Sequence, residues 1–242
     1  MELQGTTALV TGGARRVGKA IALGLAAAGC DLLLHYNRSS EEAGATAEEA
    51  RALGSRVALM GADLGEDEAA ERVLAGAGDL APVRILVNSA ASFPEDTLLN
   101  AEPDGFWGAQ QVILGGPVFL TQAFARALPA GTDGAVVNVT DWRTARPYPD
   151  HFSYIVAKGA VDTFTHAAAE VLAPAIRVNA VALGAILPPP GKDSAYLQEL
   201  AQEIPLQRIG DTPPVVDAVL ALLRNDFITG QILRVDGGAH LR

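Results

Sequence analysis

The stretch Thr11-Gly12-Gly13-Ala14-Arg15-Arg16-Val17-Gly18 decides the fold. An apolar run, Thr7 to Val10, precedes it, and a run with helical character, Lys19 to Ala28, follows it. A strand that turns on glycines directly into a helix leaves backbone N–H groups pointing out of the start of that helix, where the positive end of the helix dipole lies. The stretch therefore predicts a site for a pyrophosphate, although an ordinary strand-to-helix turn can have such a sequence too.

The rest of the chain alternates short apolar runs with longer helical patterns, as a parallel sheet flanked by helices requires. The runs that read as buried strands are 7–10, 31–35, 56–60, 84–88, 135–139, 177–181 and 231–235. The helical patterns between them cover 17–28, 39–53, 66–74, 104–127, 151–173, 194–203 and 214–224, and the segment 187–191 is too rich in proline for regular structure. Ser39 and Glu42 predict a capping box at the second helix. We expect an α/β fold in one domain, residues 1–242, with a doubly wound (Rossmann) parallel sheet of about seven strands.

Composition narrows the possible functions. The net charge of −10 over 242 residues argues against nucleic acid as a partner. Cys30 is the only cysteine, so no internal disulfide can form, and we expect a cytoplasmic protein whose Cys30 is a small buried side chain. The first residues resemble no secretion signal, no apolar run is long enough for a membrane, and the four histidines show no metal-ligand spacing. We therefore expect no membrane contact and no metal site.

The end of the second predicted strand indicates which nucleotide is bound. A carboxylate at this position holds the ribose hydroxyls of NAD, and the chain has none there. The residues present are His35, Tyr36, Asn37, Arg38 and Ser39. A cation with hydroxyl neighbours at the start of a helix suits a 2′-phosphate, so NADPH is favoured, the alternative being that Arg38 is a solvated surface side chain. Asp63, after the third strand, is either an acceptor for the adenine amino group or a loop carboxylate.

Tyr154 and Lys158 are candidates for proton transfer. Their spacing of four places both side chains on one face of the predicted helix 151–173. The helix follows a strand of a parallel sheet, and such sheets bind ligands at the carboxyl ends of their strands. We expect the Lys158 ammonium, together with an oxidised nicotinamide, to favour the phenolate of Tyr154 and so to lower its pKa from about 10 toward neutrality. An ordinary amphipathic helix face would also explain the spacing.

Five motifs in this order resemble the short-chain dehydrogenase/reductase family. They are Thr11-Gly12-x-x-x-x-x-Gly18, Asn88-x-Ala90, Tyr154-x-x-x-Lys158, Arg177-Val178-Asn179 and Asp236-Gly237-Gly238. The resemblance covers the whole chain and implies a seven-stranded doubly wound sheet, NAD(P)-dependent hydride transfer and a homotetramer (or homodimer). The cofactor contacts that we expect are Gly12, Arg15, Arg16, Val17, His35, Tyr36, Asn37, Arg38, Ser39, Asp63, Leu64, Asn88, Ser89, Ala90, Lys158, Gly184 and Ile186.

Further features resemble the pteridine reductase subgroup. Arg16 replaces the usual second glycine of the turn, Asp141 stands where most members have a serine, and Ser92-Phe93 follows the fourth strand. The resemblance implies that Arg16 lies near cofactor phosphate and pterin, that Phe93 stacks the pterin on the nicotinamide, and that Asp141 works with Tyr154 on the substrate side. An aromatic face and an acceptor-only carboxylate suit a flat ring with a guanidine-like edge. The simpler interpretations are that Phe93 is a loop aromatic that closes the cleft, and that Asp141 is a helix cap or a loop carboxylate. We expect Trp142 to be a packing residue.

The chain also departs from the family pattern. Asn88-Ser89-Ala90-Ala91 replaces Asn-Asn-Ala-Gly, Leu183-Gly184 replaces Pro-Gly, and Ile113 falls where the family has its catalytic asparagine. We expect an NADPH-dependent reductase of a pterin, dihydropterin or dihydrofolate-like small molecule, with residues 185–212 forming a substrate loop. A carbonyl reductase of the 3-oxoacyl type is the alternative, although a carboxylate at position 141 repels a developing oxyanion. Ile113 leaves a third possibility, a nucleotide-binding subunit with weak or no catalysis.

Overall fold

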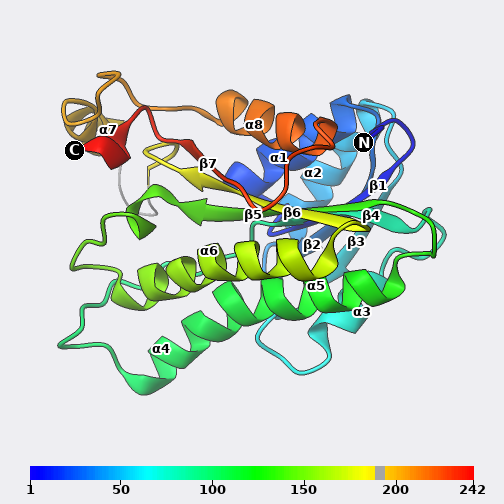
Figure 1. Cartoon of the computed structure of the whole chain (residues 1–242), viewed down its shortest axis with the longest axis horizontal. Helices are drawn as coiled ribbons and strands as arrows, with labels where there is room; N and C mark the ends of the chain where they lie inside the picture. Colours follow the sequence, from blue (N-terminus) through cyan, green and yellow to red (C-terminus); the bar gives the residue numbers. More distant parts are fainter. Residues whose placement is uncertain (189–193) are drawn as a thin grey trace.

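The computed structural model of the chain describes residues 1–188 and 194–242 (Figure 1). Over these residues, seven strands form one parallel sheet in the order β3-β2-β1-β4-β5-β6-β7. The strands are Thr7–Thr11 (β1), Asp31–Tyr36 (β2), Val57–Gly61 (β3), Val83–Asn88 (β4), Gly134–Asp141 (β5), Ile176–Leu183 (β6) and Ile232–Val235 (β7). The predicted α/β fold with a doubly wound sheet is confirmed.

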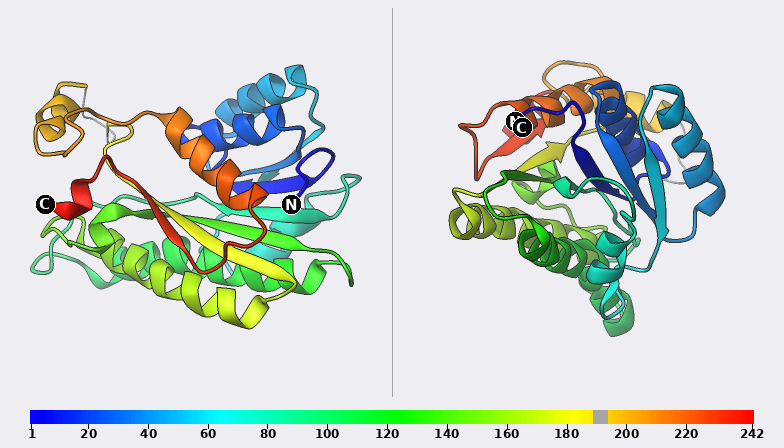
Figure 2. Two further views of the ribbon diagram at one scale, coloured as in Figure 1. Left: turned by 45° about the horizontal axis from the view of Figure 1, so that its top comes forward. Right: turned by 90° about the vertical axis from the view of Figure 1, so that its right-hand side faces the viewer.

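Helices cover both faces of the sheet, as the views in Figure 2 show. One face carries α1 (Arg16–Ala27), α2 (Ser40–Ala52) and α8 (Thr212–Arg224). The other carries α3 (Ala69–Ala75), α4 (Pro103–Gln110), α5 (Gly116–Ala127) and α6 (Phe152–Leu172), while α7 (Ser194–Ala201) lies beyond the carboxyl ends of the strands. Within 1–188 and 194–242, no helix combines the length and the apolar character that crossing a bilayer needs.

Alternate residues of the central strands supply two hydrophobic cores. Ala8 and Val10 of β1 pack with Leu25 of α1 on one face of the sheet. Leu9 packs with Phe124 of α5 on the other. All five side chains are buried, which explains why these strands read as continuous apolar runs rather than as alternating ones. Because β1 lies between β2 and β4, the strand order reverses there, and the crevice at the carboxyl ends of these strands is the binding place that such sheets provide.

The glycine turn after β1 brings two backbone segments into contact. Gly12 has a φ of +64°, which few residues other than glycine adopt without strain. A Cβ atom on Gly18, in the first turn of α1, would lie 2.2 Å from the carbonyl oxygen of Gly12. Only glycine at position 18 therefore lets α1 start this close to the turn.

The long helix predicted over 104–127 is interrupted in the structure. A π-helical turn, η1 (Gln111–Gly115), separates α4 from α5. Pro117 stands at the start of α5 and has no N–H group to donate to the preceding turn. The regular ladder of hydrogen bonds therefore cannot continue through this point, and a widened turn precedes it.

Three further expectations differ from the structure or lie partly outside it. The capping box is wrong, because Ser39 has a ψ of 55° instead of an extended backbone and its side chain makes no cap hydrogen bond. Helix α3 begins at Ala69 rather than at Glu66, since Glu68 adopts a φ of +59° just before it. Leu187 and Pro188 are outside regular elements, as predicted, whereas Pro189, Pro190 and Gly191 fall outside the described residues, as do 192 and 193 of the predicted substrate loop 185–212.

We expect Gly18→Ala to destabilise the protein, because its Cβ atom overlaps the backbone of Gly12. Overpacking of this kind lowers the free energy of unfolding by about 1–3 kcal/mol. The matched control is Gly44→Ala in α2, where a Cβ atom meets nothing within 4 Å, and the gain is about 0.5–1 kcal/mol. Urea unfolding of both variants checks the expectation, and equal stability of the two would contradict the close approach.

Candidate active site

A cleft of about 1280 Å³ opens at the carboxyl ends of the strands, on both sides of the point between β1 and β4. All but one of the residues predicted for the site line it. They are Gly12, Arg15, Arg16, Val17, His35, Tyr36, Asn37, Arg38, Ser39, Asp63, Leu64, Ser89, Ala90, Phe93, Asp141, Tyr154, Lys158, Gly184 and Ile186. Nowhere in the described part of the chain do three or more His, Cys, Asp or Glu side chains gather as they would around a metal ion.

Asn88 is the exception, because it lies buried behind the cleft. Its amide nitrogen donates to Oδ1 of Asn138 at 2.9 Å, and the amide nitrogen of Asn138 donates to Oγ1 of Thr165 at 2.9 Å. This chain of hydrogen bonds ties β4 to β5 and β5 to α6. Asn88 therefore fixes the spacing of the elements that carry the cleft residues rather than lining the cleft.

His35 supports the glycine turn from below. Its Nδ1 accepts a hydrogen bond from the N–H of Gly12 at 3.3 Å, and its Nε2 donates to the carbonyl oxygen of Ala62 at 3.0 Å. Burial lowers the pKa of His35, so the ring stays neutral, as the acceptor role of Nδ1 requires. The cation at the end of β2 is therefore Arg38, which is exposed and makes no ion pair with the described residues.

Asp63 joins the ends of β2 and β3. Its Oδ1 accepts from the N–H of Gly65 at 2.9 Å, and its Oδ2 accepts from the side-chain amide of Asn37 at 3.2 Å. It thus acts as a loop carboxylate, one of the two roles expected for it. Each carboxylate oxygen has a second lone pair, so the adenine contact stays a prediction.

Arg16 spans the cleft. Its Nη2 donates to the carbonyl oxygen of Pro188 at 2.7 Å, which links the glycine turn to the segment after β6. Arg16 has a φ of +56°, a conformation that favours glycine and costs an L-residue about 1–2 kcal/mol. This explains why similar turns have glycine at this position, and a strained residue is retained where its side chain is needed.

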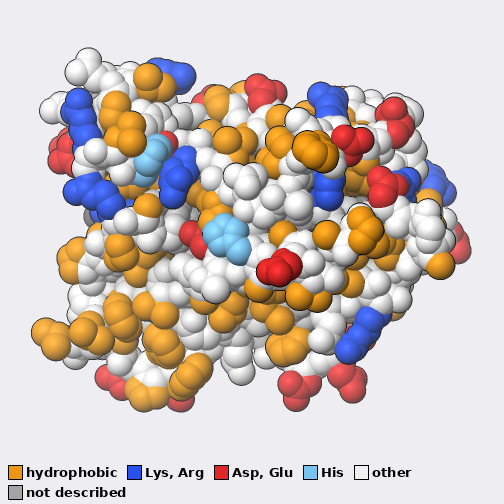
Figure 3. Space-filling view, viewed as in Figure 1, with side chains coloured by type: hydrophobic (Ala, Val, Ile, Leu, Met, Phe, Trp, Pro, Cys, Tyr) orange, Lys and Arg blue, Asp and Glu red, His pale blue; other side chains and the backbone are white. Residues whose placement is uncertain are grey.

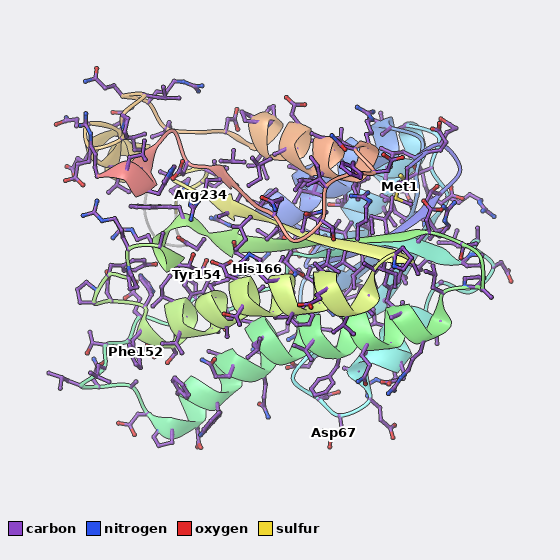
Figure 4. The ribbon with its side chains drawn as sticks, viewed as in Figure 1. Met1, Asp67, Phe152, Tyr154, His166 and Arg234 are labelled. Atoms are coloured by element: carbon purple, nitrogen blue, oxygen red, sulfur yellow. The ribbon has the colours of Figure 1, made fainter. Side chains whose placement is uncertain are left out.

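Tyr154, Asp141 and Lys158 meet where β5 ends beside the first turns of α6. The hydroxyl of Tyr154 donates to Oδ2 of Asp141 at 3.0 Å, and Oδ1 of Asp141 accepts from the backbone N–H of Arg143 at 2.8 Å. The Nζ of Lys158 donates to the carbonyl oxygen of Val139 at 2.6 Å. Figure 4 shows Tyr154 between α6 and β5, on the side of the helix that faces the sheet. Tyr154 and Lys158 are buried, so their charges are costly to form or keep.

The electrostatics of this group differ from the expectation for Tyr154. Burial, then the negative charge of Asp141, raises the pKa of Tyr154 well above its ordinary value, and Lys158 does not offset this. Burial likewise raises the pKa of Asp141, and lowers the pKa of Lys158 to about 8 although Asp141 and Asp162 oppose that shift. In the protein alone the tyrosine is therefore held as an acid, and the tuning expected when an oxidised nicotinamide lies beside it stays a prediction.

Phe93 lies above Tyr154, and its position depends on a residue that sequence reasoning missed. The His151 ring stacks on Phe93 with centroids 3.8 Å apart, and the Phe93 and Tyr154 rings meet at 81° with centroids 4.7 Å apart. Nδ1 of His151 donates to the carbonyl oxygen of Pro94 at 2.7 Å, and His151 has a φ of +54°. One face of Phe93 is thus covered, and the residue keeps 37% exposure toward the cleft. No motif identifies His151, since the contact joins two loops far apart in sequence.

Ile113 fills the position of the family asparagine with an apolar side chain. It lies in the π-helical turn η1, is 1% exposed, and packs in one cluster with Tyr154, Ala157 and Val161 of α6. The turn η1 is π-helical although position 113 has no amide side chain. The side chain of Ile113 has no donor or acceptor with which to hold a proton-relay water beside Tyr154.

This chain is similar to known proteins along nearly its whole length. The family model described as enoyl-(acyl carrier protein) reductase matches residues 12–240. The crystal structure of FolM alternative dihydrofolate reductase 1 from Brucella canis, complexed with NADP, has a TM-score of 0.93 and 37% identity, covering 100% of this chain and 97% of that one. The 3-oxoacyl-(acyl-carrier-protein) reductase of Synechocystis sp. is 31% identical over 98% of this chain and 97% of that protein. The L-xylulose reductase of Bos taurus is 33% identical over 98% of both.

We expect Arg16→Gly to weaken NADPH binding without destabilising the fold. Glycine relieves the strain at φ +56° but gains freedom in the unfolded chain, so the free energy of unfolding changes by less than about 1 kcal/mol. The dissociation constant for NADPH rises about threefold to tenfold, because a charged contact and the link to Pro188 are lost. Glu68→Gly, at a φ of +59° outside the cleft, is the control and leaves this constant unchanged. Unaltered NADPH affinity in Arg16→Gly would show that Arg16 serves the fold alone.

We expect Asp141→Asn to lower the pKa of Tyr154. Removing the carboxylate charge takes away a cause of the raised pKa, so tyrosinate forms at a lower pH than in the parent protein. The ultraviolet absorbance of tyrosinate, taken as the difference from a Tyr154→Phe protein, measures this. Asp150→Asn is the control, since Asp150 lines the same cleft but does not affect Tyr154. Identical titrations of the parent and Asp141→Asn would mean that Asp141 does not hold the phenol in its acid form.

Proposed function

The chain belongs to the short-chain dehydrogenase/reductase family of oxidoreductases, and we propose that it reduces a pterin or dihydropterin ring, that of dihydrofolate included, with NADPH. One observation carries the proposal. Asp141 stands beside the acid Tyr154, with Tyr154 donating to it at 3.0 Å. A half-buried carboxylate accepts hydrogen bonds from a ring with an amidine or guanidine edge, and disfavours a substrate that develops negative charge there.

NADP(H) is the cofactor, and the residues of the cleft fit it. The first N–H groups of α1 open toward the glycine turn and suit a pyrophosphate. A Cβ atom on Gly12 would lie 3.0 Å from Cα of Ala90, so the turn forms a cradle that a side chain would fill. Arg38, exposed at the end of β2 and without an ion pair among the described residues, meets the 2′-phosphate. Tyr36, Asn37, Ser39, Leu64, Ser89, Gly184 and Ile186 line the remaining contacts that we propose for the nucleotide.

The pterin ring lies on Phe93 in this proposal. His151 covers one face of the Phe93 ring, which leaves the other for an aromatic substrate. Tyr154 meets the Phe93 ring nearly at right angles, so its hydroxyl is placed at the rim of a ring stacked there. Asp141, bonded to that hydroxyl, then reaches the edge of the substrate.

The reaction needs a hydride on carbon and a proton on nitrogen. Bound NADPH supplies the hydride. Tyr154 supplies the proton, and its raised pKa keeps it in the donating form over the physiological range. Once Tyr154 has given up its proton, Asp141, whose pKa burial also raises, takes up a proton from solvent and passes it to the phenolate, which restores both groups. Lys158 lies on the same face of α6. Its positive charge stabilises the negative charge of Asp141 while Asp141 and Tyr154 exchange the proton.

The relatives support two of the activities considered. The name of the Brucella canis protein, an alternative dihydrofolate reductase, favours the pterin activity. The Synechocystis protein supports the alternative, a carbonyl reductase of the 3-oxoacyl type. The carboxylate of Asp141 next to Tyr154 favours the pterin activity, because a carbonyl group reduced there would develop negative charge against it. Ile113 in place of a polar side chain supports slower turnover rather than lost chemistry, since Tyr154 and Lys158 keep their places.

We propose a homotetramer or homodimer in the cytoplasm. Exposed apolar side chains gather along α4, α5 and α6, below the sheet in Figure 3, among them Trp107 (63% exposed) and Phe119 (60%). A surface of this kind is typical of a contact between copies. The single thiol, Cys30, is buried, which suits a reducing compartment.

An NADPH oxidation assay tests the proposed function. We expect dihydrobiopterin, dihydromonapterin or dihydrofolate to be reduced with a kcat/KM at least about tenfold above that for a 3-oxoacyl thioester or a simple ketone. Tyr154→Phe should lose about a hundredfold or more of the activity, since it removes the proton donor. Activity on ketones without activity on pterins would establish the carbonyl reductase instead. Tight NADPH binding with no turnover on either class would establish a binding subunit.

A further inference from the structure

Arg143 is held in an unusual setting beside the proposed substrate. Its guanidinium carbon lies 4.8 Å from the ring centroid of Trp142 and 4.3 Å from that of Tyr148. The residue is half-buried and lines the cleft. Its guanidinium makes no ion pair and donates no hydrogen bond to any described residue, although a partly buried charge ordinarily has a partner. Two aromatic rings thus fix a cation whose N–H groups remain available.

Rings connect Arg143 to the reaction centre. Phe93 stands 4.7 Å from Tyr154 and 3.8 Å from His151, measured between centroids, and His151 stands 6.1 Å from Tyr148. Tyr148 then contacts Arg143. A run of neighbouring aromatic rings therefore leads from the proton donor to the guanidinium. The path is anchored at both ends, because the N–H of Arg143 donates to Asp141 at 2.8 Å and His151 donates to Pro94 at 2.7 Å.

The charges around this end of the cleft favour an anion. Arg146 and Arg242 line it together with Arg143, and Figure 3 shows several Lys and Arg side chains, with acidic ones among them, at the end of the molecule where the strands finish. The opposing carboxylates of the lining there are Asp150 and Glu203, both exposed and without an ion pair among the described residues. Asp141 is engaged by Tyr154 and by the N–H of Arg143. Cations thus collect in one place on a chain whose net charge is −10.

We propose that Arg143, held between Trp142 and Tyr148, binds a carboxylate at the far end of the substrate. The inference rests on the proposed function and narrows its substrate class. A substrate that matches the path carries a pterin ring at Phe93, an aromatic linker beside His151 and Tyr148, and a terminal carboxylate, which is the chemistry of dihydrofolate. A guanidinium that packs against aromatic rings still has its N–H groups to donate, and these pair with both oxygens of a carboxylate. Uncharged dihydropterins leave this subsite unused.

The test compares Arg143→Gln with the parent on dihydrofolate and on dihydrobiopterin. We expect the ratio of kcat/KM for dihydrofolate to that for dihydrobiopterin to fall about tenfold, through the KM for dihydrofolate. The ratio is used because Arg143 also lowers the pKa of Asp141, and any change there affects both substrates alike. In the parent, the KM for dihydrofolate rises with ionic strength, whereas in Arg143→Gln this dependence is reduced. Arg126→Gln, an exposed residue of α5 outside the cleft, is the control of equal charge and keeps the ratio.

Equilibrium binding gives a second readout that does not depend on turnover. With NADP bound, the affinity for folate falls in Arg143→Gln, because one charged contact is lost. The affinity for biopterin, which does not make this contact, is retained to within about twofold. An unchanged substrate ratio together with unchanged folate affinity would overturn the carboxylate subsite and leave the pterin activity standing. If the parent reduced neither pterin, the proposed function itself would fail, and the subsite with it.

Discussion

The hydrogen bond from Tyr154 to Asp141 is the interaction on which the site depends. It exists because β5 extends through Asp141, where it still pairs with Leu183 of β6, and because α6 begins soon enough to return Tyr154 to the end of that strand. Burial raises the pKa of both groups, and the charge of Asp141 raises that of Tyr154 further, whereas the hydrogen bond from Tyr154 stabilises the Asp141 carboxylate. The result is a proton donor held in its acid form beside an acceptor-only group. That combination suits reduction of a nitrogen-containing ring better than reduction of a ketone.

The cleft around this pair is built from residues whose backbones are strained or crowded. Arg16 and His151 both adopt positive φ values, and each uses its side chain at the cleft, on Pro188 and on Phe93 respectively. Gly18 allows α1 to approach the turn, and the neutral ring of His35 holds Gly12 from below. Such conformations persist only where the rest of the fold offsets their cost. Here the stability of the buried sheet offsets it.

Local patterns were enough to predict the sheet, the glycine turn and the spacing of Tyr154 and Lys158, because these follow from burial and helical periodicity. The pattern could not show that β5 continues to Asp141, since Thr140 and Asp141 are polar residues whose strand pairing is decided by β6. The stacking of His151 on Phe93 and the clamping of Arg143 depend on how loops pack, which leaves no periodic signal. The raised pKa of Tyr154 in the protein alone could not be predicted, because the depth of burial cannot be read from the spacing of two residues.

The most direct measurement is a crystal structure of the protein with NADP and a non-reducible pterin bound. The account predicts the pterin between the nicotinamide and the face of Phe93 that His151 leaves open, with Asp141 on the ring edge and the Tyr154 hydroxyl at a ring nitrogen. A pterin bound elsewhere, or one in the cleft with Asp141 still engaged only by Tyr154 and Phe93 clear of the ring, would contradict it.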